Sequence, residues 1–116
     1  MRILITGNMG YVGSYLVQHL RSALPSAKLI GYDIGYFSKY LTNAPFLPEY
    51  SIDLQYFADV RKISADILTQ NQIDAVIHLA AISNDPMGKA YETITGDVNY
   101  GASIRLARLA DRKSGV

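Results

Sequence analysis

The sequence contains no cysteine among its 116 residues, which excludes disulfide bonds, thiolate metal sites and a cysteine nucleophile. This absence fits a reducing compartment, and we expect a cytoplasmic protein. An excess of charge of either sign is also missing, because the eleven Lys and Arg residues nearly balance the ten Asp and Glu residues, which gives a net charge of +1. Neither a nucleic acid nor a membrane surface is therefore an expected partner.

Long apolar runs are absent as well, and no stretch approaches the ~20 residues of a membrane-spanning helix. The first predicted strand begins at residue 2, so we expect no signal peptide. No cluster of ligands suggests a metal site. His19 lies on a predicted helix with no carboxylate nearby and is expected at the surface, whereas His78 lies in a buried strand and is expected to be a hydrogen-bonded core residue rather than a catalyst.

The stretch from Ile3 to Gly13 reads Ile-Leu-Ile-Thr-Gly-Asn-Met-Gly-Tyr-Val-Gly and predicts a strand, a glycine-rich turn and a helix. Such a turn leaves the first N–H groups of the helix unpaired, a positive end suited to a pyrophosphate. We expect Gly7 to allow the tight turn, Gly10 to let a phosphate approach, and Gly13 to let the helix pack closely. The spacing G-x-x-G-x-x-G is one residue longer than the usual dinucleotide fingerprint.

Asp33 strengthens this interpretation, because it lies 20 residues beyond Gly13 at the end of a second apolar run. An acidic side chain there accepts hydrogen bonds from both hydroxyls of an adenosine ribose and repels a 2′-phosphate. The sequence therefore predicts NAD rather than NADP. The alternative is an ordinary β-α turn, with Asp33 merely ending a strand.

Strand and helix patterns alternate along the chain, with an irregular segment at 34–49. The expected strands are 2–6, 28–33, 50–56 and 75–79, and the expected helices are 11–24, 64–70 and about 90–112. Right-handed crossovers then give a Rossmann-type, doubly wound parallel sheet of order 3-2-1-4. The glycine turn, Asp33, Asp59 and the loop at 79–83 would meet at the carboxyl ends of the strands.

The last predicted helix carries its own pattern. Its apolar positions include Ala102, Ile104, Leu106, Leu109 and Ala110. Three arginines, Arg105, Arg108 and Arg112, share another face, which we interpret as solvated; contact with a substrate phosphate or a partner is the alternative.

Taken together, the glycine motif, Asp33, Asp59-Val60-Arg61 and His78-Leu79-Ala80-Ala81 resemble the extended short-chain dehydrogenase/reductase family, specifically its NAD-dependent sugar-nucleotide epimerases and dehydratases. The resemblance runs over essentially the whole chain, and it implies roles for further residues. Tyr11 and Val12 would line the pyrophosphate, and Asp59 and Val60 would meet the adenine edge. Leu79, Ala80 and Ala81 would line the cofactor near its second ribose. Asn99 would support the active site, and Ser83 would face the nucleotide-sugar substrate.

The family's catalytic Tyr-x-x-x-Lys pair is missing, because no tyrosine here has a lysine four residues later. We therefore expect an NAD-binding portion, residues 1–116, that stops before the fifth strand and the catalytic segment. The alternative is a non-catalytic dinucleotide-binding or sensing module. A methyltransferase fits the glycine spacing less well, and a P-loop is excluded because no Lys-Ser/Thr follows the glycines. The unpaired edge of the fourth strand predicts a homodimer or a domain-swapped association.

Overall fold

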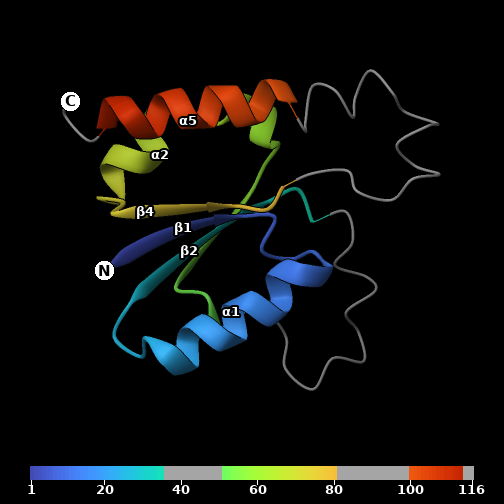
Figure 1. The fold of residues 1–116 in the computed structure, drawn as a ribbon, viewed down its shortest axis with the longest axis vertical. Helices are drawn as coiled ribbons and strands as arrows, with labels where there is room; N and C mark the ends of the chain where they lie inside the picture. The colour runs from blue at the N-terminus through green and yellow to red at the C-terminus, as the bar shows by residue number, and fades with distance from the viewer. Residues whose placement is uncertain (36–50, 81–99, 114–116) are drawn as a thin grey trace.

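The computed structural model describes residues 1–35, 51–80 and 100–113. In chain order the elements are β1 (Arg2–Thr6), α1 (Tyr11–Ala23), β2 (Lys28–Asp33), β3 (Leu54–Phe57), the short 3₁₀ helix η3 (Val60–Lys62), α2 (Ala65–Gln70), β4 (Ala75–His78) and α5 (Ala102–Lys113). The four strands are parallel and form one sheet of order β3-β2-β1-β4. Helix α1 covers one face of the sheet, and α2 and α5 cover the other (Figure 1). The predicted architecture and strand order are confirmed.

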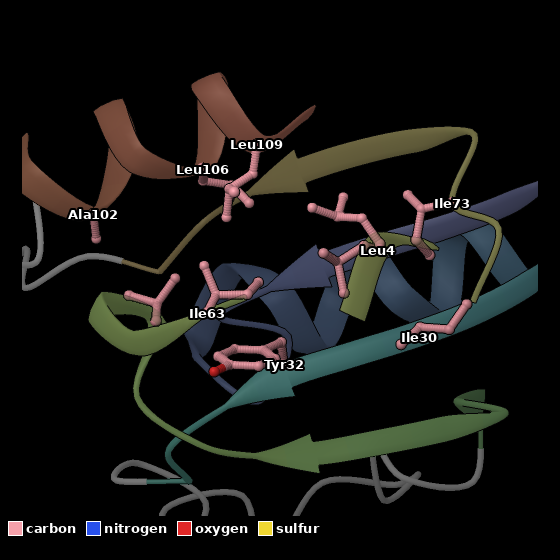
Figure 2. Packing of buried hydrophobic residues seen from close by; sticks show 10 residues of the cluster. Leu4, Ile30, Tyr32, Ile63, Ile73, Ala102, Leu106 and Leu109 are labelled. Carbon is pink, nitrogen blue, oxygen red and sulfur yellow. The ribbon is translucent and has the colours of Figure 1, made fainter. Parts of the chain in front are cut away.

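Apolar residues fill both faces of the sheet, since successive side chains of a strand point to opposite sides. Ile3 and Ile5 of β1 pack with Val17 of α1, whereas Leu4 packs on the side of α5. Figure 2 shows this second cluster, in which Leu106 and Leu109 point from α5 toward the strands. A strand sandwiched between two helical layers needs no polar positions, which explains the uninterrupted apolar run of β1.

Strand β3 is shorter than predicted, because it begins at Leu54 rather than at residue 50. The carboxylate of Asp53 accepts the backbone N–H of Leu29 at 2.8 Å, and it also binds Arg21 at 2.7 Å. This side chain therefore takes the place that a strand carbonyl would occupy on β2. The other predicted bounds agree within a residue for α1, β1, β2, α2 and β4.

Helix α5 corrects two expectations. Ile104 was expected on the apolar face but is 39% exposed, because it lies two residues, or about 200° of helical rotation, from the buried Ala102 and Leu106. Arg105 is not only solvated, since its Nε donates to the carbonyl oxygen of Ile63 at 2.9 Å. This bond fastens α5 to the segment after η3. The part of the predicted helix before residue 100 lies outside the described residues.

Candidate functional site

Four segments lie together at the carboxyl edge of the sheet, as predicted. The turn after β1 is joined to β2 by a hydrogen bond from the Gly7 N–H to the Tyr32 carbonyl at 2.9 Å. It is joined to the end of β4 by a bond from the Leu79 N–H to the Thr6 carbonyl at 3.0 Å. Asp59 follows β3 on the far side of β2. The glycine turn is therefore at the centre of the edge.

Two glycines make this turn possible for different reasons. Gly7 has a φ of +72°, and a Cβ on it would lie 2.7 Å from the Ala80 nitrogen. A Cβ on Gly13 would lie 2.2 Å from the Gly7 carbonyl oxygen. The tight turn and the close helix packing predicted for these residues are confirmed, although the close contact at Gly13 is with the turn rather than with the strand.

The amino terminus of α1 has no side-chain cap. Gly10 is its N-cap residue and has no side chain that could accept from the first-turn N–H groups, and no acidic residue lies in that turn. A Cβ on Gly10 would meet only the Gly7 oxygen, at 3.3 Å. Tyr11 and Val12 are 80% and 63% exposed. This combination leaves a positive helix end to which an anionic group has access.

Asp33 ends β2 directly beside the turn. Its Oδ2 accepts the backbone N–H of Met9 at 2.9 Å, and its Oδ1 accepts that of Gly35 at 2.8 Å. Two backbone donors thus fix the plane of the carboxylate. Because an ionised carboxylate has about four acceptor positions, it retains capacity for the two hydroxyls of a ribose.

Asp59 is the N-cap residue of η3 and is paired with Arg61. Its Oδ1 accepts the Arg61 backbone N–H at 2.9 Å, and its Oδ2 lies 2.5 Å from the Arg61 guanidinium. The side-chain hydrogen bond from Arg61 lowers the pKa of Asp59, with burial opposing it. Val60 is buried in the core, so only its backbone is available to a ligand.

His78 connects β1, β4 and α5. Its Nδ1 lies 2.6 Å from the Thr6 hydroxyl, and its Nε2 lies 2.9 Å from the hydroxyl of Ser103. The Thr6 oxygen also accepts from the N–H groups of Leu79 and Ala80, at 3.2 and 3.3 Å. With both lone pairs of that oxygen used, its proton points to Nδ1, which assigns the Nε2–H tautomer to His78. Burial lowers the pKa of this histidine.

The prediction that His78 is hydrogen-bonded is confirmed, although the residue is half-buried rather than in the core, and His19 is exposed as expected. Three predicted site residues, Ala81, Ser83 and Asn99, lie outside the described residues. Within the described ranges, no group of three or more His, Asp or Glu is placed to hold a metal ion. No described helix is both long and apolar enough to cross a membrane.

One further pair at this edge was not among the predicted site residues. The side-chain amides of Asn8 and Gln55 bind each other, at 2.6 Å from Asn8 Nδ2 to Gln55 Oε1 and at 3.2 Å from Gln55 Nε2 to Asn8 Oδ1. The two residues are 47 positions apart. Asn8 stands at an unspecified position of the glycine motif, and Gln55 belongs to no motif.

The parallel sheet of order 3-2-1-4, the glycine turn at its centre and the acidic residue after β2 define a Rossmann-type nucleotide-binding domain. The chain matches the model of the NAD dependent epimerase/dehydratase family over residues 3–116, and it belongs to that family. The predicted family and the predicted NAD cofactor agree with this result.

Solved structures share the fold. A UDP-glucose 4-epimerase from Stenotrophomonas maltophila, solved with NAD and formylated UDP-arabinopyranose, is 25% identical with a TM-score of 0.77, covering 100% of this chain and 34% of that one. An L-threonine dehydrogenase from Clostridium difficile is 21% identical with a TM-score of 0.76, covering 97% and 34%. A dTDP-glucose 4,6-dehydratase from Bacillus anthracis, in complex with NAD, is 17% identical with a TM-score of 0.69, covering 97% and 34%. The chain therefore spans about a third of the length of these proteins.

Proposed function

We propose that this chain is the NAD-binding portion of an NAD-dependent sugar-nucleotide epimerase or dehydratase. The arrangement of Asp33 carries the proposal, because its carboxylate is held 2.9 Å from the N–H of Met9 in the glycine turn. A ribose acceptor and a pyrophosphate-binding helix end are thereby adjacent, as a dinucleotide requires. NAD, when bound, supplies hydride transfer. The described residues of this chain would hold its adenosine half and pyrophosphate.

Within this proposal the remaining predicted contacts keep their roles. Tyr11 and Val12 would line the pyrophosphate, and Leu79 and Ala80 would line the cofactor beyond it. Asp59, whose carboxylate is already paired with Arg61, would meet the adenine edge together with the Val60 backbone.

Calorimetric titration of the 116-residue chain with NAD tests the proposal. Asp33→Asn keeps one acceptor for the Met9 N–H but removes the charge that binds the ribose. Because hydrogen bonds to charged groups contribute about 1.5–3 kcal/mol, we expect a loss of NAD affinity of roughly 10- to 100-fold. The wild type should prefer NAD to NADP, and Asp33→Asn should lose that preference. Asp66→Asn, an exposed position on α2, is the matched control. Equal affinity of wild type and Asp33→Asn would contradict the proposal.

A second candidate is a non-catalytic dinucleotide-binding or sensing module, which would use the same Asp33 and glycine turn. The two candidates share the cofactor site and differ in the chemistry that surrounds it. Reading the coding sequence downstream of Val116 separates them, because only an epimerase or dehydratase requires a Tyr-x-x-x-Lys segment there. A nucleotide-sugar substrate belongs to the first candidate alone.

A cytoplasmic location and a homodimeric or domain-swapped state also belong to the proposal. The location is supported by the lack of cysteine. Association is supported by β4, which pairs only with β1 among the strands that the structure describes. Sedimentation velocity over a range of concentrations should show a dimer. A monomer at the highest concentration would contradict that part.

A further inference from the structure

The amide pair of Asn8 and Gln55 connects two segments that are not neighbours in the sheet. Asn8 belongs to the turn after β1, and Gln55 lies on β3, with β2 between the two strands. Adjacent strands are about 4.8 Å apart, so a link from β1 to β3 must cross β2. Asn8 is completely buried, and the second N–H of the Gln55 amide binds the Tyr56 carbonyl at 2.9 Å. The Gln55 amide is thus fixed by a further hydrogen bond, and the Asn8 amide is enclosed by the surrounding protein.

Gly31 is the residue of β2 over which the pair passes. A Cβ at this position would lie 2.3 Å from the Gln55 Oε1 and 2.5 Å from the Asn8 Nδ2. In the sheet register Gly31 lies opposite Gln55, so both residues lie on the face of the sheet that α1 covers. Any side chain larger than hydrogen at Gly31 would separate the two amides. Glycine in this strand is therefore explained by the close approach of the pair.

The pair also determines where the next residue lies. Met9 follows Asn8 directly, and its N–H donates to the Asp33 carboxylate at 2.9 Å. Because the Asn8 side chain reaches across β2 to Gln55, the Met9 N–H lies next to Asp33 at the end of β2. The position of the glycine turn relative to Asp33 consequently depends on a side chain from β3.

We propose that Asn8 and Gln55 are positioning residues that set the spacing between the positive end of α1 and the ribose-binding carboxylate of Asp33. The proposal rests on the proposed function, because the two sites matter jointly only for a ligand that spans them. Such a ligand gains from both contacts only when their spacing is correct, as in any bivalent interaction. NAD spans both sites, whereas adenosine has no phosphate and uses only the ribose side.

The test compares NAD and adenosine on the same variants. Gln55→Met keeps the shape of the side chain and removes its hydrogen bonds, and Asn8→Ala removes the other partner. We expect each variant to bind NAD roughly tenfold more weakly, the equivalent of one or two lost hydrogen bonds, and to bind adenosine as the wild type does. Gln70→Met, an exposed position on α2, is the matched control. Loss of affinity for both ligands in equal measure, or for neither, would overturn the proposal.

A double-mutant cycle shows whether the two residues act as one unit. The variant with both substitutions should lose no more NAD affinity than the weaker-binding single variant, because the second substitution removes nothing that remains. Additive losses would show that Asn8 and Gln55 act separately and would contradict the proposal.

Hydrogen exchange of the Met9 amide tests the same link without any ligand. We expect this amide to exchange roughly tenfold faster in Gln55→Met than in wild type, while the core amides of β1 exchange at unchanged rates. Because the exchange measurement needs no ligand, it can also be made on a variant whose NAD binding is too weak to measure. A wild-type chain that binds no NAD would overturn the proposed function, and an unchanged Met9 amide would overturn the positioning role.

Discussion

Substituting Thr6 by valine should destabilise the fold through His78, although the two side chains have nearly the same shape. The Thr6 hydroxyl is completely buried and lies 2.6 Å from the His78 Nδ1. It also accepts from the N–H groups of Leu79 and Ala80. Leu79 keeps a partner in the Thr6 carbonyl at 3.0 Å. The substitution therefore removes two hydrogen bonds that have no replacement among the described contacts, one to His78 and one to Ala80.

At a net value of about 0.5–1.5 kcal/mol for each hydrogen bond, the free energy of unfolding should fall by roughly 1–3 kcal/mol. Urea denaturation followed by circular dichroism measures this loss as a lower midpoint with an unchanged slope. A loss under about 0.5 kcal/mol would refute the assigned network, because each bond alone would be expected to contribute that much.

The same histidine predicts a pH dependence. Burial lowers the pKa of His78, so the folded chain binds this proton less readily than the unfolded chain. The unfolded state is protonated first as the pH falls below about 6.5, which favours unfolding. Stability should thus be highest above that pH, fall as the pH drops below it, and level off below the folded pKa. His78→Gln should flatten this profile, whereas His19→Gln, at an exposed position, should not. A profile unchanged in His78→Gln would contradict the prediction.

Two further substitutions test the turn and the opposite end of the sheet. Gly13→Ala should lower both stability and NAD affinity, by about 1–3 kcal/mol of overpacking, because its Cβ would overlap the Gly7 carbonyl oxygen. Thermal melting measures the loss of stability, and calorimetry measures the loss of affinity. Gly101→Ala is the control, because a Cβ there would meet nothing within 4 Å. Arg21→Met should lower the free energy of unfolding by about 1–2 kcal/mol in urea denaturation, because the guanidinium binds the carbonyl oxygens of Ser51 and Ala27, each at 2.8 Å. These contacts lie at the opposite end of α1 from the glycine turn, so NAD affinity should be unchanged.

Elements that depend on local pattern could be predicted from the sequence. The apolar run of β1 and the three glycines after it contain within twelve residues everything that specifies a strand, a turn and a helix start. The place of Asp33 beside the turn could be predicted because the distance from the turn to the end of the next strand varies little in βαβ units. The need for glycine at positions 7 and 13 could also be predicted, because it follows from the glycine motif. A side chain at Gly13 would meet atoms of the turn itself, and one at Gly7 would meet the backbone at the end of β4.

What the sequence could not indicate depends on contacts between distant segments. The start of β3 depends on whether Asp53 binds the Leu29 N–H, and the exposure of Ile104 depends on the rotation of α5 against the sheet. Asn8 and Gln55 carry no periodic or spacing signal, because an amide pair needs only that two side chains meet. Gly31 offered the one available hint, as a glycine within an apolar strand indicates close approach of another group.

The glycine turn is held from both neighbouring strands, and this has a consequence for its role. On the side of β2 and β3 it is fixed through the Met9 N–H and the amide of Asn8, and on the side of β4 through the Thr6 hydroxyl. The first set leads to the ribose acceptor and the second to the segment that begins with Leu79 and Ala80. In the proposed cofactor site, a dinucleotide would bridge these two sides. The contacts that hold the turn therefore join the two halves of the proposed cofactor site, which makes the turn a structural link between them as well as the proposed binding element for the pyrophosphate.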